Sequence, residues 1–233
     1  MSSEQSRAVD GSAKKASAPG VTRREAIGGM LKAAGGACVT VFALQALVTS
    51  TEARAASALR PPGALDEDDF LSACVRCGLC VRACPYDTLR LATLGEPAPL
   101  GTPYFIAREN PCLMCPDVPC ARACPTGALD RDIPNIRSAD MGVAVLVGHE
   151  TCLNYKGLTC SICYRVCPIR GEAITLETHV INGERMLIPT VHSDQCTGCG
   201  VCEKQCVIKE AAIRVLPRPL GLGAEGRNPA GRV

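Results

Sequence analysis

The spacing of the cysteines constrains this chain more than any other feature of its sequence. Residues 74–85 read Cys-Val-Arg-Cys-Gly-Leu-Cys-Val-Arg-Ala-Cys-Pro, so two residues separate the first three cysteines and three precede the fourth. Sixteen of the seventeen cysteines fall into four groups related to this one. The groups are Cys74, Cys77, Cys80 and Cys84; Cys112, Cys115, Cys120 and Cys124; Cys152, Cys160, Cys163 and Cys167; and Cys196, Cys199, Cys202 and Cys206.

The groups recur at nearly constant intervals. Between the last cysteine of one group and the first of the next lie 27, 27 and 28 residues, which indicates duplication of one structural unit. A proline follows the fourth cysteine in the first three groups, whereas Val207 stands there in the last. In each unit we expect the three close cysteines on a loop, the fourth at the start of a short helix, and an apolar strand after it.

This spacing suits iron–sulfur clusters. A [4Fe-4S] cubane needs a thiolate at each of its four irons, and three cysteines spaced by two residues can wrap one face of it. The fourth cysteine points the other way and completes a neighbouring cluster, as in two-cluster bacterial ferredoxins. The sequence therefore predicts four [4Fe-4S] clusters in two pairs, with the sixteen grouped cysteines as their ligands.

Other uses of cysteine explain the pattern less well. Structural zinc sites use four cysteines, but usually as two separated Cys-x-x-Cys pairs. Disulfides suit an exported protein, but they would not explain the repeated spacing. Covalent haem needs Cys-x-x-Cys-His, which does not occur in the sequence.

Composition and charge narrow the function. The 233-residue chain has no tryptophan and 3% aromatic residues, so we expect clusters to replace much of a hydrophobic core. The formal net charge is +2 and no basic run is interleaved with aromatics, so nucleic acid is not an expected partner. No phosphate-binding glycine motif occurs, and every cysteine group is complete, which leaves no open iron for radical chemistry. We expect an electron carrier without a substrate site of its own.

Residues 1–55 have the order of an export signal. Arg23 and Arg24 precede an apolar stretch at residues 33–48, and residues 53–55, Ala-Arg-Ala, form a small-x-small cleavage site. The paired arginines resemble a twin-arginine signal. Because clusters are normally inserted in the cytoplasm, a route that exports folded proteins suits this chain, and we expect a periplasmic protein.

The match to a twin-arginine signal is imperfect, because Ala26 stands where a bulky apolar residue is usual. An uncleaved membrane anchor is the alternative reading. The apolar stretch is shorter than the about 20 residues that a spanning helix needs. We interpret Cys38, the one ungrouped cysteine, as a small apolar residue that is lost with the signal.

The rest of the chain predicts an α+β protein: a duplicated bacterial 2[4Fe-4S] ferredoxin-like fold, with short helices and hairpins around four clusters. Residues 56–69 are rich in proline and acidic residues and predict an exposed acidic linker, which ends as the acidic first turn of a helix. Residues 70–216 form the four-cluster domain as two paired-cluster modules. Residues 217–233 are rich in proline and glycine and predict a disordered tail.

Strands are expected where apolar residues alternate or run together. Residues 173–177 and 186–191 flank Asn182-Gly183, a strong hairpin signal. Residues 141–147 and 212–216 are the other expected strands.

Two groups carry insertions, at residues 116–119 and 153–159, which are either longer surface loops or segments that shield a cluster or dock a partner. His149 and His192 precede the third and fourth groups, and we expect them to be exposed or hydrogen-bonded.

The leader, the group at residues 152–168 and the run Cys196-Thr-Gly-Cys199-Gly together resemble the ferredoxin-type proteins NapG and MauM, and the second group resembles the electron-transfer subunits of the DMSO reductase family. The resemblance implies a periplasmic carrier that relays electrons from a membrane ferredoxin-type quinol dehydrogenase, similar to NapH, towards periplasmic nitrate reductase through a downstream periplasmic cytochrome or reductase. The alternatives are a carrier or maturation factor for methylamine dehydrogenase, or a subunit of another molybdoenzyme.

The residues leave the pairing of the groups open. Sequential pairing joins group one with two and three with four, whereas nested pairing, as in the DMSO reductase relatives, joins one with four and two with three. We favour the nested arrangement. Its ligand sets are Cys74, Cys77, Cys80 and Cys206; Cys196, Cys199, Cys202 and Cys84; Cys112, Cys115, Cys120 and Cys167; and Cys152, Cys160, Cys163 and Cys124.

Overall fold

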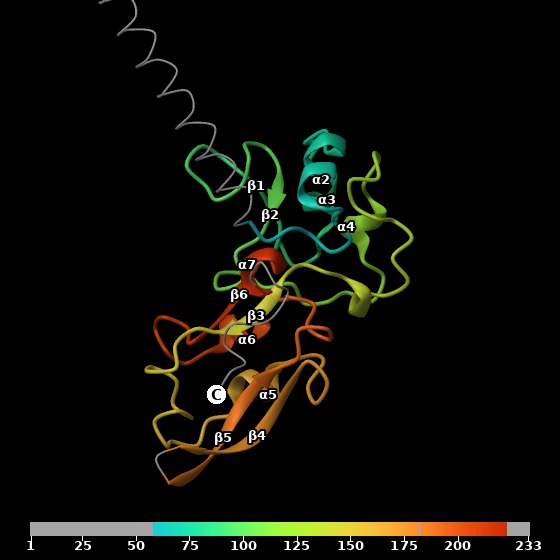
Figure 1. Ribbon diagram of the computed structural model, residues 1–233. Coiled ribbons are helices and arrows are strands. Elements are labelled where there is room, and N and C mark those ends of the chain that lie inside the picture. The colour runs from blue at the N-terminus through green and yellow to red at the C-terminus, as the bar shows by residue number, and fades with distance from the viewer. Residues whose placement is uncertain (1–57, 182, 223–233) are drawn as a thin grey trace, which may run out of the picture. The chain divides into compact units, whose positions relative to one another are not determined.

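The computed structural model describes residues 58–181 and 183–222 (Figure 1). All of them belong to one compact unit, residues 49–233. The expected leader, with Cys38, lies outside the described residues, as do Asn182 and residues 223–233.

Short helices and two-stranded sheets make up the fold, as an α+β protein requires. The helices are α2 (Glu67–Ala73), α3 (Leu79–Ala83), α4 (Pro119–Arg122), α5 (Ile162–Val166), α6 (Val201–Gln205), α7 (Arg218–Leu222) and the 3-10 helix η1 (Ile136–Ser138). The strands are β1 (Arg90–Leu91), β2 (Pro103–Tyr104), β3 (Val143–Leu146), β4 (Ile174–Ile181), β5 (Glu184–Val191) and β6 (Ile213–Leu216). In Figure 1, α2, α3 and α4 lie near β1 and β2, while α5 lies beside β4 and β5.

Each described sheet is an antiparallel pair: β1 with β2, β3 with β6, and β4 with β5. The strands expected near residues 143, 174, 187 and 213 are confirmed. In the β4–β5 hairpin Ile174 pairs with Val191 and Ile181 with Glu184, and Gly183 in its turn has φ +85°, which glycine adopts without strain. The pairing of β3 with β6 joins the middle of the chain to its last repeat.

The expectation that the fourth cysteine starts a helix is wrong. Helices α3, α5 and α6 each contain the third cysteine of a group and end at the fourth, and Cys84, Cys167 and Cys206 have extended ψ angles of 114–125°. Proline disfavours helical geometry in the residue before it, which explains the first two. Cys206 is extended although no proline follows, so the helix end does not depend on proline.

The expected linker is exposed only in part: residues 58–62 are buried, whereas residues 65, 66, 68 and 69 are exposed. The guanidinium of Arg60 donates to the Glu67 carboxylate at 2.9 Å and to the Thr102 hydroxyl at 3.0 Å. It also lies 4.8 Å from the centre of the Phe70 ring. Of the acidic residues that suggested an exposed linker, Glu67 is therefore paired with Arg60, while Asp66, Asp68 and Asp69 are exposed. The acidic first turn of α2 is where the sequence placed it.

The expected disordered tail is wrong for residues 217–222, which are described and include α7. Gly221 is buried against β3, and a Cβ there would lie 2.3 Å from a methyl group of Val143. Arg218 donates to the backbone oxygens of Ser193 and Cys196 and pairs with Asp140. Gly221 belongs to the glycine-rich composition that suggested a disordered tail, yet it packs against β3, and Arg218 holds the same segment through its ion pair with Asp140.

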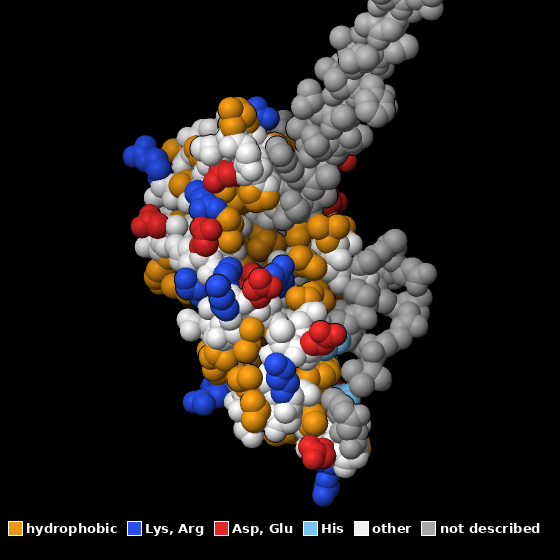
Figure 2. Space-filling model, turned by 90° about the vertical axis from the view of Figure 1, so that its left-hand side faces the viewer, with side chains coloured by type: hydrophobic (Ala, Val, Ile, Leu, Met, Phe, Trp, Pro, Cys, Tyr) orange, Lys and Arg blue, Asp and Glu red, His pale blue; other side chains and the backbone are white. Residues whose placement is uncertain are grey.

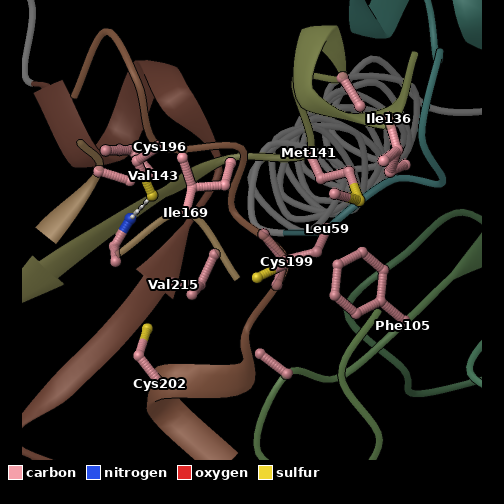
Figure 3. Packing of buried hydrophobic residues seen from close by; sticks show 14 of the residues in the cluster. Leu59, Phe105, Ile136, Met141, Val143, Ile169, Cys196, Cys199, Cys202 and Val215 are labelled. Atoms are coloured by element: carbon pink, nitrogen blue, oxygen red, sulfur yellow. Dashed lines mark hydrogen bonds between the residues drawn. The ribbon is translucent and has the colours of Figure 1, made fainter. Parts of the chain in front are cut away.

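Cysteines form a large part of the main core. Figure 3 shows Cys196 beside Val143 and Ile169, with a dashed line marking the hydrogen bond from the backbone N–H of Ala144 to its sulfur, 3.4 Å long. The largest fully buried side chains are Tyr104, Phe70 and Phe105, and most other core residues are small. With so few large side chains, the core depends on what the cysteines hold.

Gly198 allows two parts of the backbone to come into contact. We therefore expect a substitution there to cost more thermal stability than one at a glycine with open space around it. The φ of Gly198 is +72°, and a Cβ would lie 2.5 Å from the backbone of Gly142. Gly171 has φ +85° with open space around it. Gly198→Ala should therefore lower the Tm of the cluster-loaded protein by roughly 4–8 °C more than Gly171→Ala, which carries only the conformational cost. Equal losses in thermal unfolding would show that the close approach does not matter.

Candidate metal centres

Each of four cavities is lined by four cysteines. We name them site A (Cys74, Cys77, Cys80 and Cys124), site B (Cys84, Cys112, Cys115 and Cys120), site C (Cys167, Cys196, Cys199 and Cys202) and site D (Cys152, Cys160, Cys163 and Cys206). All sixteen grouped cysteines are thereby placed in a site. Each site takes three cysteines from one group and the fourth from another.

Nested pairing is wrong, because the sites pair group one with two and three with four. The cause is local: α3 packs against α4 and α5 against α6, so neighbouring repeats face each other. Helix α3 carries Cys80 in site A and ends at Cys84 in site B. The arrangement in the DMSO reductase relatives therefore does not transfer to this chain.

The four cavities have similar volumes, as four sites for the same bound group would. Their empty volumes, including the part open to solvent, are about 330, 360, 320 and 390 Å³ for sites A to D. Across the described segments, no set of three or more His, Cys, Asp or Glu side chains converges as a single metal ion would require. All sixteen described cysteines are free thiols. Four sulfurs spread around a cavity match the corners of a cubane, whereas zinc would draw them to about 2.3 Å from one ion.

The cysteine loops turn through the left-handed region of backbone space. The residue before the second cysteine has positive φ in three groups: 56° at Arg76, 56° at Met114 and 72° at Gly198. For a residue other than glycine this costs about 1–3 kcal/mol, and it persists only where the surroundings fix the backbone. The sequence did not predict the left-handed conformation of Arg76 and Met114. The only indication of it was Gly198, a glycine at the matching position of the fourth group.

Burial makes half of the described thiols poor acids. It is the main cause that raises the pKa to about 11 for Cys80 and to about 12 for Cys112, Cys120, Cys163 and Cys199. Such thiols stay protonated near neutral pH unless a metal binds them, so loading the sites releases protons.

Cys124 behaves differently. Burial alone would raise its pKa, but the backbone N–H groups of Leu129, Thr126 and Gly127 and the Thr126 hydroxyl lower it below its ordinary value. Its sulfur therefore sits among hydrogen-bond donors that favour negative charge.

Sites B and C adjoin and link the two pairs. The backbone N–H of Cys112 donates to the carbonyl oxygen of Cys199 at 2.8 Å. The hydroxyl of Thr197 lies 3.7 Å from the sulfur of Met114. Because A and B share α3, and C and D share α5 and α6, the sites follow one another in the order A, B, C, D.

The two insertions are packed against their sites. In the third group the buried Asn154 lines site D, and its side-chain amide donates to the carbonyl of Leu187. In the second, Val118 is buried and lines site B. The insertions thus cover the sites to which they belong.

The two histidines occupy different surroundings. His192 meets the Thr175 hydroxyl at 2.8 Å, as expected for a hydrogen-bonded histidine. His149 stacks on Tyr155 with ring centres 4.7 Å apart.

Known proteins match this chain closely. A family model for a 4Fe-4S dicluster domain matches residues 73–128 and 158–209. The methylamine utilization ferredoxin-type protein MauM of Methylorubrum extorquens is 75% identical over 211 residues, covering 91% of this chain and 96% of that protein. MauM of Paracoccus denitrificans is 69% identical, with coverage of 91% and 95%. The ferredoxin-type protein NapG of Escherichia coli is 54% identical, with coverage of 88% and 90%.

The chain belongs to the MauM and NapG family of ferredoxin-type proteins. The predicted family is confirmed, and with it an iron–sulfur electron carrier that holds 4Fe-4S clusters. The first dicluster match contains all the cysteines of groups one and two, the pair that forms sites A and B. No helix in this ferredoxin-type chain, within the segments that are described, is long and apolar enough to cross a membrane.

The sequential pairing predicts which cysteines of this ferredoxin-type protein become open to alkylation together when one cysteine is replaced. Cys84→Ala should remove a ligand of site B, so that Cys112, Cys115 and Cys120 become open to alkylation. Cys167→Ala is the reciprocal control and should open Cys196, Cys199 and Cys202. Peptide mass mapping after alkylation of the loaded proteins reads out both variants. Nested pairing would exchange the two outcomes.

The hydrogen bonds of Arg108 lead to a second prediction, on the stability of the contact between the two pairs of sites. The Arg108 guanidinium donates to the carbonyl oxygens of Cys206 at 2.9 Å and of Ile208 at 2.8 Å, and also binds the end of α6. Arg108→Ala should lower the free energy of unfolding by at least ~2 kcal/mol, because partly buried carbonyls lose a charged donor. Arg122→Ala, at an exposed position on α4, should cost far less in the same thermal unfolding measurement. Similar losses would contradict this role.

Proposed function

We propose that this chain carries four [4Fe-4S] clusters, one in each of sites A to D, and relays electrons through them without a substrate site of its own. The sixteen grouped cysteines are the proposed ligands. The observation that carries the proposal is the set of four similar cavities, each lined by four free cysteines. Each cluster, when bound, accepts and releases one electron; the protein positions the clusters and limits their contact with water.

The chain's own residues set the route. In α3 and α6, the third cysteine of a group lies in the helix and the fourth cysteine ends it, and these two cysteines belong to adjacent sites. One helical turn therefore fixes the spacing of the two sites within a pair. The hydrogen bond from Cys112 to Cys199 provides the short connection between pairs. In the described part, a larger cavity is lined by residues that include Arg60, Leu71 and Arg218, and by no cysteine. Both arginines are already paired with acids, which supports a carrier with no substrate chemistry.

The proposed location is the periplasm, reached in the folded state by the twin-arginine route. Arg23 and Arg24, the apolar stretch at 33–48 and the small residues at 53–55 support it. The proposed partners are a membrane quinol dehydrogenase of the ferredoxin type and a downstream periplasmic cytochrome or reductase. On the face in Figure 2, acidic and basic side chains are interspersed, in keeping with protein partners rather than nucleic acid.

The degree of identity favours methylamine utilization over nitrate reduction as the pathway. Relatives named MauM are 62–75% identical to this chain, and those named NapG are 53–54% identical. We therefore place electron transfer in methylamine utilization first. Transfer towards periplasmic nitrate reductase is the second candidate, favoured by the 88% of the chain that aligns with NapG.

Metal analysis and redox assays test the carrier function. Anaerobically purified protein should contain about sixteen irons and as many sulfides per chain. Its clusters should be reduced by quinol-linked membranes and reoxidised by a periplasmic acceptor. About four zinc ions per chain, or clusters that no membrane donor reduces, would rule the carrier out.

The pathway is tested in the cell. A deletion strain should lose growth on methylamine and regain it with the intact gene, while periplasmic nitrate reduction stays unchanged. A variant that lacks Cys112 and Cys199 should fail to restore growth if electrons must cross from B to C. A maturation role would instead lower the amount of active methylamine dehydrogenase.

A further inference from the structure

We propose that Thr126, with the loop that follows Cys124, gives site A the highest reduction potential of the four, so that the first electron to enter the protein comes to rest there. The proposal rests on the proposed four-cluster function. It assigns Thr126 as a positioning residue that acts on a ligand sulfur and does not bind the cluster itself.

The loop places donors around one sulfur. The Thr126 hydroxyl lies 3.7 Å from the Cys124 sulfur, and the backbone N–H groups of Thr126, Gly127 and Leu129 also interact with it. The guanidinium of Arg131 donates to the carbonyl oxygen of Cys124 and closes the loop. The loop therefore has a fixed shape around this sulfur.

The other sites lack this arrangement. At the matching position, two residues after the fourth cysteine, stand Tyr86, Ile169 and Ile208. Within the described chain, Thr126 is the residue whose side-chain hydroxyl lies within hydrogen-bond distance of a cysteine sulfur; backbone N–H groups reach sulfurs in other sites as well, such as that of Ala144 to Cys196 and that of Ile169 to Cys167.

Charge determines the direction of the effect. Reduction transfers one electron from the donor to a cluster and makes the cluster and its thiolates more negative, with no bond formed and no proton moved. Donors that point at a ligand sulfur stabilise the more negative state and so raise the potential. Contact with water acts in the same direction, and Cys77, also in site A, is exposed.

The position of site A determines where an electron held by its higher reduction potential comes to rest. Site A is at one end of the order A to D, so the electron would settle at a terminus beside the exposed Cys77. Val75 and Leu79, on the same loop and helix, are 62% and 40% exposed. An electron resting there is available to a partner at this end, and site D is then the entry.

Potentiometric titration of the loaded protein, followed by electron paramagnetic resonance, tests the proposal. Thr126→Val should shift the reduction equilibrium of the highest-potential cluster about fivefold towards the oxidised form, the size expected for one net hydrogen bond. The other three midpoints should stay in place. Thr126→Ser keeps the hydroxyl and should restore the wild-type value. Thr93→Val removes a hydroxyl that contacts Glu96 on the surface and should change nothing.

The outcomes separate this inference from the proposed function. A wild-type protein with four reducible clusters whose highest midpoint is unmoved by Thr126→Val would overturn the inference alone. A wild-type protein without four reducible clusters would overturn the proposed function. Thr126 is exposed, so the variant should fold; if Thr126→Val lost iron, Thr126→Ala would serve for the same comparison, and an unmoved highest midpoint would again overturn the inference.

Discussion

The exchange of the fourth cysteine between neighbouring sites is the constraint on which the structure depends. In α3, a helix of five residues, Cys80 belongs to site A and the cysteine that ends the helix, Cys84, belongs to site B. One helical turn therefore fixes the separation of two sites. Helices α5 and α6 repeat the arrangement for C and D. The contacts of Arg108 and the backbone hydrogen bond between Cys112 and Cys199 hold the two pairs together.

Folding and metal binding are coupled in such a chain. The core has few large side chains, and burial raises the pKa of several of its thiols, such as Cys112 and Cys199, so the metal-free protein buries neutral sulfur in its interior. Residues in the left-handed conformation, such as Arg76 and Met114, add backbone strain, which lowers the stability of the cysteine loops unless their surroundings fix them. Binding free energy at sites of this type is also folding free energy. The proposed export in the folded state agrees with this coupling, because the clusters would then be in place before the chain crosses the membrane.

The sequence predicts the chemistry of this chain better than its geometry. Cysteine spacing identifies the grouped residues that the structure brings together, and alternation of apolar residues predicts β3, β4, β5 and β6. Pairing could not be read from spacing, because each fourth cysteine is free to reach any neighbour until the helices pack. The buried segment at residues 58–62 and helix α7 look like linker and tail, since arginine, proline and glycine also mark exposed segments. Only contacts distant in sequence, such as Arg60 with Thr102 and Gly221 with Val143, bury them.

Sequential pairing also changes what the duplication means. Each pair of sites comes from a continuous stretch of the chain, and the two stretches meet at the backbone hydrogen bond between Cys112 and Cys199. Two identical modules joined in this way would give electrons no preferred direction. Direction must therefore come from residues in which the repeats differ, such as Thr126 where another repeat has Ile169, or Val207 in place of a proline. The ligands are common to all repeats, and the residues next to them are where this chain can determine which end receives the electron.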